Sequence, residues 1–314
     1  MPIALNLFLL IIGFVLLVQS ANVFVDASVG IARYLKVPTL VIGLTVVAMG
    51  TSAPELVISI SAALGGNSSL AIANAVGSNL FNLLFIVGFC AMLYPISVQT
   101  ARISRDYWVS VAATVALLIL IYTFAGSAIP RFGGFMFLTG FATYMFVVVR
   151  SAMKNRVEEE TDDTEQKPLW KNIVIAIISV ALIMGAGQLT VMSAIDIAEF
   201  LGVSERIIGL TIISIGTSLP ELVTTIIACR KKEGEFAIGF IIGSGIFNLM
   251  FVLGIAGAII PLDVEPSALF DIAVLMIGTL AFFLYAKSGQ KLVRVEGLLM
   301  VLMYAGYMSF VLLM

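Results

Sequence analysis

Histidine is absent from the 314-residue sequence, and cysteine occurs only twice. Without imidazole, the chain lacks the usual side chain for proton relay and a common zinc ligand. The two thiols, Cys90 and Cys229, each lie inside or at the edge of an apolar run. We therefore expect both to pack as small apolar residues, and not to form a disulfide or a metal pair.

Charged residues are also scarce, at 11% of the sequence against 61% hydrophobic residues. Together with a mean hydropathy of +1.12, this excludes a soluble domain and predicts an all-α polytopic membrane protein in a lipid bilayer. The net charge of −2 gives no sign of a nucleic-acid partner. No obligatory protein partner or cofactor is evident. No basic segment precedes the first apolar run, so we expect a retained first helix and no cleaved signal peptide.

Ten apolar segments are long enough to span a membrane as helices. Their approximate ranges are 5–29, 38–64, 70–93, 107–125, 132–149, 172–198, 206–229, 236–260, 268–286 and 294–313. Fifteen of the 17 lysines and arginines fall in the odd-numbered connections between these segments, and only Arg131 and Arg206 fall in the even ones. By the positive-inside rule the odd connections are cytoplasmic, so both termini are expected outside the plasma membrane.

The sequence repeats itself after 166 residues, since a shift of that length superposes 31–60 on 197–226 and 71–95 on 237–261 without a gap. Each copy holds five predicted helices, an odd number, so the second copy must enter the membrane upside down. We therefore expect two inverted-topology repeats, at 1–150 and 172–314, with a cytoplasmic linker at 151–171. Such repeats are typical of secondary transporters that bind their substrate near the bilayer midplane.

The linker is acidic, with Glu158, Glu159, Glu160, Asp162 and Asp163 close together. A calcium-sensing loop would need spaced ligands and a turn glycine, which this run lacks. We interpret it as a solvated linker.

A proline and a glutamate lie near the centre of the second and of the seventh predicted span. Residues 50–56 read Gly-Thr-Ser-Ala-Pro-Glu-Leu, and residues 216–222 read Gly-Thr-Ser-Leu-Pro-Glu-Leu. The proline frees carbonyl oxygens that water cannot reach, and a charged glutamate facing lipid costs roughly 2.5–3.5 kcal/mol. A structural alternative is the capping box Ser-x-x-Glu, which restarts a helix. It accounts for the hydroxyls but not for an ionisable group in mid-membrane, so we expect something to bind here.

Four polar clusters lie near the span centres, two in each half. They comprise Thr51, Ser52, Glu55, Ser78 and Asn82 in the first half, and Thr217, Ser218, Glu221, Ser244 and Asn248 in the second. A lone hydroxyl or amide in a membrane helix is more often a contact between helices than an ion ligand. Placement beside a glutamate in both halves favours a site instead. The oxygen donors suit Ca²⁺ or Na⁺ and argue against Zn²⁺ or Cu⁺.

The two heptapeptides are followed by Gly-Ser-Asn-Leu-Phe-Asn at 77–82 and Gly-Ser-Gly-Ile-Phe-Asn at 243–248. This pattern resembles the two alpha-repeats of the cation/calcium exchanger superfamily, most of all the sodium/calcium exchangers of prokaryotes. The resemblance implies exchange of Ca²⁺ against several Na⁺ by alternating access, with the first and sixth helices sliding across a rigid core. It also implies site residues: Glu55 and Glu221 bridging Ca²⁺, Thr51 and Thr217 contributing oxygens, and flanking Na⁺ sites at Ala48, Ser52 and Ser78 and at Ser214, Ser218 and Ser244.

Two positions depart from the family pattern. Well-studied members often carry aspartate where this chain has Asn248, and asparagine where it has Gly245. Asparagine at 248 resembles the proton/calcium exchangers and some sodium- or lithium-coupled relatives, and speaks against K⁺ co-transport. The proton-coupled branch, however, usually has asparagine where this chain has Thr51-Ser52. We therefore predict sodium/calcium exchange without K⁺, with H⁺/Ca²⁺ antiport as the alternative.

Other functional classes fit the sequence less well. A channel would use the same oxygen donors, but channels seldom place a charged pair at the midplane of an inverted repeat. A membrane scaffold has no need of the duplicated glutamates. An intramembrane enzyme needs a nucleophile–base pair or a metal, and the sequence indicates neither, so we predict a transporter and not an enzyme.

Overall fold

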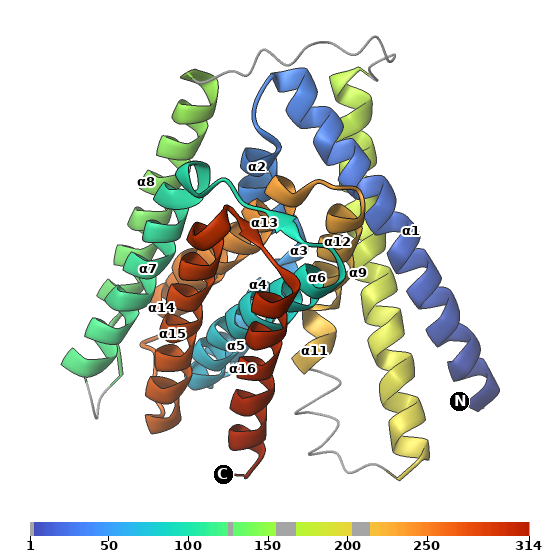
Figure 1. The fold of residues 1–314 in the computed structure, drawn as a ribbon. Coiled ribbons are helices and arrows are strands. Elements are labelled where there is room, and N and C mark those ends of the chain that lie inside the picture. The colour runs from blue at the N-terminus through green and yellow to red at the C-terminus, as the bar shows by residue number, and fades with distance from the viewer. Residues whose placement is uncertain (1–2, 125–127, 155–167, 203–213, 314) are drawn as a thin grey trace.

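The computed structural model describes residues 3–124, 128–154, 168–202 and 214–313, and these are almost entirely helical (Figure 1). Eight helical spans in this part of the chain are long and apolar enough to cross a membrane, and the bent pair Thr39–Thr51 and Ala53–Leu64 makes a ninth. The protein is therefore a multi-pass integral membrane protein. The predicted segment 206–229 lies partly outside the described residues, which resume at Ser214.

The first half begins with the long helix α1 (Ile3–Leu35). A discontinuous second span consists of α2 (Thr39–Ile42), the π-helical segment η1 (Gly43–Val47), α3 (Ala48–Thr51) and α4 (Ala53–Leu64). A third span follows as α5 (Ser68–Leu80), the π-helical η2 (Phe81–Ile86) and α6 (Val87–Leu93). The short strand β1 (Ile96–Ser97) and the helices α7 (Thr100–Thr123) and α8 (Arg131–Lys154) complete this half.

In the second half the described helices follow one another in the same order, whereas its short strand comes after the fourth span and not before it. It comprises α9 (Leu169–Phe200), α11 (Ser214–Thr217), α12 (Leu219–Arg230), α13 (Gly234–Ile246), the π-helical η4 (Phe247–Val252), α14 (Leu253–Ile259), α15 (Pro266–Gly289), β2 (Lys291–Leu292) and α16 (Arg294–Leu313). From α3 to α7, each helical element and its counterpart in the second half begin and end 166 residues apart. The repeat in the sequence is thus also a repeat of helix boundaries.

Left-handed residues end helices at equivalent places in both halves. Lys36 has φ 55° where its equivalent Gly202 has φ 76°, and Gly66 has φ 80° where Lys232 has φ 65°. A left-handed residue just after the last turn lets the chain satisfy the final carbonyl groups of a helix. The two lysines show that this backbone turn is kept even where a side chain makes it less favourable.

Both termini lie at the same end of the molecule, and α8 ends and α9 begins at the opposite end (Figure 1). The strands β1 and β2 pair antiparallel through Ile96 with Leu292. A separate β-bridge joins Ile129 to Leu262, and Leu262 is the repeat equivalent of Ile96. Each half therefore contributes the residue that follows its third span to one such contact.

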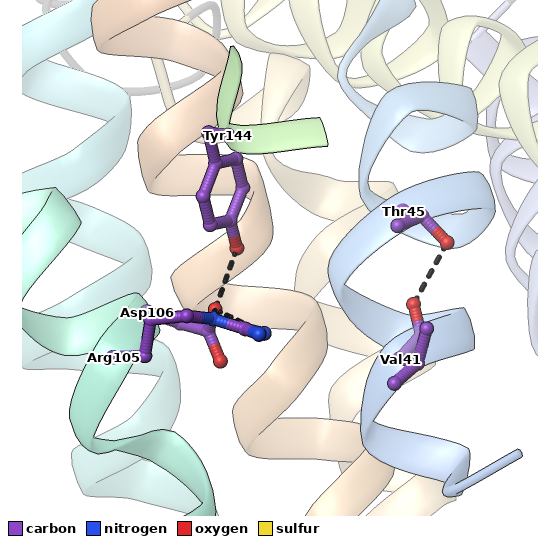
Figure 2. A network of polar contacts seen from close by, with 5 residues as sticks. All are labelled: Val41, Thr45, Arg105, Asp106 and Tyr144. Atoms are coloured by element: carbon purple, nitrogen blue, oxygen red, sulfur yellow. Dashed lines mark hydrogen bonds and ion pairs between the residues drawn. The ribbon is translucent and has the colours of Figure 1, made fainter. Parts of the chain in front are cut away.

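Several helices are longer than predicted, and in one of them a charged residue near the end is accommodated inside the fold. The helix predicted at 107–125 begins at Thr100, so that Asp106 lies within α7 and is fully buried. Its Oδ1 accepts hydrogen bonds from Tyr144 of α8 at 3.1 Å and from Nε of Arg105 at 2.9 Å (Figure 2). These partners compensate for burying the carboxylate, which a search for apolar runs does not detect.

The two halves approach closely where η1 meets α13. A Cβ added at Gly43 would lie 2.6 Å from the Phe236 carbonyl oxygen, and one added at Gly243 would lie 2.5 Å from the Leu44 carbonyl oxygen. Only glycine allows these backbones so near to each other. Within η1, the Thr45 hydroxyl donates to the Val41 carbonyl at 2.7 Å (Figure 2).

The long helices α1 and α9 pack against each other along their length. Cys90 and Cys229 are free thiols in the core, buried as predicted for packing residues.

Candidate ion-binding site

The second span and its counterpart in the second half break at equivalent serines. Ser52 has φ −84° and ψ 13°, and Ser218 has φ −93° and ψ 10°. Each break is followed by a proline in the first helical turn, and the two arms of the second span meet at a bend of 48°. Because Pro54 has no N–H, the carbonyl of Gly50 receives no helical bond from it. The broken helices thus bring polar backbone to the centre of the molecule.

The capping-box interpretation of the hydroxyls is wrong. Neither Ser52 nor Ser218 makes a side-chain hydrogen bond to cap the helix that follows it. The Ser52 hydroxyl turns instead toward the other half, where it donates to Glu221 Oε1 at 3.2 Å and lies 2.8 Å from Ser244 Oγ. This serine contributes to a site between the halves and not to local helix geometry.

The contacts continue from Ser244 to η2. Asn82 Nδ2 donates to Ser244 Oγ at 3.3 Å. All four side chains in this chain of contacts, those of Asn82, Ser244, Ser52 and Glu221, are buried. Residues predicted from separate motifs are therefore adjacent in space.

Glu55 is fully buried on the first half's side of the same site. Its carboxylate interacts electrostatically with that of Glu221, and the Ser218 hydroxyl lies near it. Asn74 of α5 donates to the Glu55 carbonyl at 3.1 Å and to Ser59 Oγ at 3.0 Å. These bonds hold the start of α4 against α5, and so fix where the Glu55 backbone lies.

Asn248 joins the site through Asn79, a residue that lies outside the predicted polar clusters. Its Nδ2 donates to Asn79 Oδ1 at 3.2 Å, and Asn79 Nδ2 donates to the Gly245 carbonyl at 3.0 Å. Asn79 belongs to the first half and Gly245 is its repeat equivalent. Asn79 is therefore hydrogen-bonded both to its own repeat equivalent, Gly245, and to Asn248.

Five buried oxygens at this site have no hydrogen-bond partner among the described residues. They are both carboxylate oxygens of Glu55, Oε2 of Glu221, Oδ1 of Asn82 and Oδ1 of Asn248. Buried acceptors without partners are rare and unfavourable in folded proteins. Every one of them belongs to a residue that the sequence predicted as a ligand, and carboxylate and amide oxygens are groups that a hard cation binds.

The remaining predicted residues have differing positions. Thr51 is buried near Glu221, but its hydroxyl donates to the Val47 carbonyl at 3.2 Å. Ala48 and Ser78 are buried, whereas Thr217 is half-buried. The Ser214 side chain lies outside the described part of the structure.

A small cavity of about 30 Å³ lies beside the amides of Asn79 and Asn82, on the side of α7 and α15. Its polar lining includes Asn79, Asn82, Tyr107, Ser110 and Thr279. A cavity needs roughly 10–15 Å³ to hold one water molecule, so this one has room for water. The hydroxyl of Tyr107 is buried without a partner among the described residues, which such water would provide.

The ligand chemistry of the site is that of a hard cation. In the described part of the chain, no group of three or more histidine, cysteine or acidic residues forms a transition-metal cluster. Two carboxylates with amide and hydroxyl oxygens form an all-oxygen set of the kind that Ca²⁺ and Na⁺ prefer over softer metals.

Comparison with known proteins agrees with this chemistry. The family model described as "Sodium/calcium exchanger protein" matches residues 5–150 and 171–313. The protein CaxA of Alkalimonas amylolytica is 38% identical over 309 residues, 95% of each chain. The sodium/calcium exchanger MaX1 of Methanosarcina acetivorans is 32% identical over 343 residues, 98% of each chain.

A solved structure has the same fold. The sodium-calcium exchanger NCX_Mj superposes with a TM-score of 0.85 and 29% sequence identity, covering 98% of this chain and 99% of that one. The family match, which spans both halves, and the two relatives of nearly equal length lead to the same assignment. This chain belongs to the sodium/calcium exchanger family, whose members are membrane transporters and not enzymes.

Proposed function

We propose that this protein exchanges Ca²⁺ for Na⁺ across the plasma membrane by alternating access, without a requirement for K⁺. Its family and the relative MaX1, named as a sodium/calcium exchanger, support this class of activity. The observation that carries the proposal is a group of five buried oxygens on Glu55, Glu221, Asn82 and Asn248, none of which has a hydrogen-bond partner in the part of the chain that the structure describes. These four residues come from both halves, and a cation between them would compensate for the burial of each.

The charge of the site favours binding of one Ca²⁺ in the half of the transport cycle that carries calcium. Glu55 and Glu221 supply two negative charges, which one Ca²⁺ neutralises, and a neutral loaded site crosses a low-dielectric barrier more easily than a charged one. The hydroxyls of Ser52, Ser218 and Ser244 lie around the carboxylates and are buried. They offer neutral oxygens for Na⁺ in the other half of the cycle, together with Thr51, Thr217, Ser78 and Ser214 and the backbone near Ala48.

Alternating access follows if the ten helices form two inverted repeats, 1–150 and 172–314, joined by the cytoplasmic linker 151–171. The matched helix boundaries and the paired contacts of Ile96 and Leu262 support this architecture. In it, α1 and α9 are equivalent helices that pack against each other. We propose that this pair slides across the remaining helices and exposes the site first to one side and then to the other.

The orientation rests on the distribution of basic residues. The ends of the helices at the α8–α9 side of the molecule carry most of them, including Arg33, Lys154 and Lys287. By the positive-inside rule this side is cytoplasmic, and both termini lie outside.

Antiport of H⁺ against Ca²⁺ remains the second candidate, because Asn248 stands where an acid is frequent in the family. Protons would need only the carboxylates of Glu55 and Glu221. The buried serine oxygens beside those carboxylates would then have little use, whereas they suit Na⁺ well. An amide at 248 carries no charge at working pH, which also speaks against an additional K⁺.

The test is uptake of ⁴⁵Ca²⁺ into proteoliposomes driven in turn by an outward Na⁺ gradient and by a pH gradient. We expect the Na⁺ gradient to drive uptake in K⁺-free medium and the pH gradient alone to fail. Full uptake from the pH gradient without Na⁺ would establish the proton alternative instead.

A further inference from the structure

Asn248 contributes an amide to the site, and an amide can present either an oxygen or an N–H group. Only the oxygen can bind a cation; the N–H group would repel it. Asn248 is fully buried, and its Oδ1 has no hydrogen-bond partner among the described residues. The affinity of the site for a cation therefore depends on what fixes the rotation of this amide.

Asn79 fixes it through a backbone group that can only accept. The Gly245 carbonyl takes a hydrogen bond at 3.0 Å from Asn79, so the Asn79 nitrogen must face Gly245 and its Oδ1 must face Asn248. The Asn248 nitrogen then donates to that Oδ1 at 3.2 Å. Reversing either amide would bring two acceptors or two donors together, so a carbonyl of the backbone determines both orientations.

The repeat shows why one residue can do this for both halves. Position 245 has no side chain, and a Cβ there would lie 3.6 Å from Asn79 Nδ2, so Asn79 packs directly against this position. On the other side of the site, Asn82 is oriented differently, by donating to Ser244 Oγ at 3.3 Å. The amides of Asn82 and Asn248 thus use their N–H groups for protein contacts, and their oxygens have no partner within the described residues.

We infer that Asn79 is a positioning residue, which holds the Asn248 carbonyl oxygen toward the transported cation and thereby sets the affinity for Ca²⁺. The inference rests on the proposed cation site. Asn79 lies between the Asn248 amide and the cavity of about 30 Å³ that Asn79 lines. Without the Asn79 side chain, water from this cavity would reach the Asn248 amide and bond it in either orientation, so that the amide would rotate freely.

The decisive experiment compares Asn79→Ala in two backgrounds, wild type and Asn248→Asp. A carboxylate at 248 has oxygen at both terminal positions, so its rotation no longer matters. The KM for Ca²⁺ and the maximal rate are measured in Na⁺-loaded proteoliposomes, and Ca²⁺ binding to the purified protein is measured by titration calorimetry. We expect Asn79→Ala to raise the KM and the Kd for Ca²⁺ about tenfold in the wild-type background. In the Asn248→Asp background we expect no loss of affinity, because Asn79 Oδ1 there faces a carboxylate oxygen and its removal relieves this contact between two acceptors.

A matched control is Asn74→Ala. Asn74 also lies on α5, but its side chain donates to the backbone carbonyl of Glu55 and makes no hydrogen bond to Asn248. Its effect should be the same in both backgrounds. If Asn79→Ala does not yield folded protein, Asn79→Ser carries the same comparison. If the Asn248→Asp background does not transport, the calorimetric Kd values decide.

Two failures are distinguishable. Equal effects of Asn79→Ala in both backgrounds, or no effect in wild type, would overturn the role of Asn79 while leaving exchange intact. Wild-type protein that neither binds Ca²⁺ nor exchanges it for Na⁺ would overturn the proposed function itself.

Discussion

The Ser52 hydroxyl donates to Glu221 Oε1 at 3.2 Å, although the two residues are 169 positions apart and belong to different halves. Both side chains are buried, and the second carboxylate oxygen of Glu221 has no partner among the described residues. The helix break of one half therefore supports the carboxylate of the other. If these groups bind the transported cation as proposed, a displacement of either half changes the ligands that both provide, and coupling between ions requires such a change.

Replacing this hydroxyl should affect Na⁺ more than Ca²⁺. In Ser52→Ala and in Ser218→Ala, a neutral oxygen beside each carboxylate is lost, whereas both negative charges remain. We expect the Na⁺ concentration for half-maximal exchange to rise several-fold, by roughly the 1 kcal/mol of one hydrogen bond or ligand, and the KM for Ca²⁺ to change less. The measurement is ⁴⁵Ca²⁺ uptake at graded internal Na⁺.

Ser309→Ala is the matched control, because Ser309 is exposed on α16 and bonds only its own helix, at the Ala305 carbonyl. Wild-type Na⁺ dependence in both site variants would contradict the assignment of these serines to Na⁺.

Removing one carboxylate should abolish calcium exchange. In Glu55→Gln or Glu221→Gln, a single negative charge would face a divalent ion in a site of low effective dielectric, where the missing interaction is large. We expect uptake at background level from protein that elutes as a single species in size-exclusion chromatography. Glu199→Gln, at an exposed position near the end of α9, should transport normally. Near wild-type uptake by either site variant would refute the two-carboxylate site.

Much of the fold could be predicted from the sequence, because the sequence shows apolar runs and an internal repeat whose two copies are offset by 166 residues. The helix ends could not be predicted in the same way: the charge of Asp106 marks the end of an apolar run, but Arg105 and Tyr144 compensate for this charge inside α7. Such compensation depends on a neighbouring helix, which no local pattern reveals.

The candidate site was proposed from the symmetry of the sequence, and the same symmetry explains which residues were missed. Asn79 and Asn74 have Gly245 and Phe240 as their repeat equivalents, so neither qualified as a paired polar residue. Both are polar residues within an apolar span, which is the signal that could have identified them. The Ser52 hydroxyl posed a different problem, because Ser-x-x-Glu predicts a local cap and only the assembled halves place that hydroxyl on Glu221.

The membrane orientation can be tested by cysteine labelling after Cys90 and Cys229 are replaced by alanine. Lys154→Cys, at the exposed end of α8, should react with an impermeant maleimide only from the cytoplasm. Glu265→Cys and Leu313→Cys should react only from outside. The reverse pattern would refute the orientation, and labelling of Lys154→Cys and Leu313→Cys from one side would refute the helix count.

An ion pair between Lys231 and Asp26 ties α1 to the end of α12, and Lys231 Nζ also donates to the Asn22 carbonyl at 2.9 Å. If α1 slides, this contact must break. The Asp26 side chain is 66% exposed, so the pair contributes at most about 1 kcal/mol. We expect Asp26→Asn to raise the maximal exchange rate, by no more than about fivefold, and to leave the KM for Ca²⁺ unchanged. The charge swap Asp26→Lys with Lys231→Asp should restore the slower rate; a rate in Asp26→Asn equal to wild type would show that the contact does not oppose the motion.

The last prediction concerns charge movement, which follows from the neutral amides at 82 and 248. Glu55 and Glu221 supply at most two negative charges, so one Ca²⁺ leaves the site neutral, whereas three Na⁺ would leave it with a charge of +1. Exchange of three Na⁺ per Ca²⁺ therefore moves one positive charge with Na⁺. When Na⁺ leaves a vesicle and Ca²⁺ enters, this charge moves outward, so an inside-positive potential should accelerate uptake and an inside-negative one should slow it. The potential is set with valinomycin and opposite K⁺ gradients, after K⁺ alone has been shown to have no effect. Uptake that ignores the potential would exclude three Na⁺ per Ca²⁺ and favour an electroneutral exchange, of two Na⁺ or two H⁺ for each Ca²⁺.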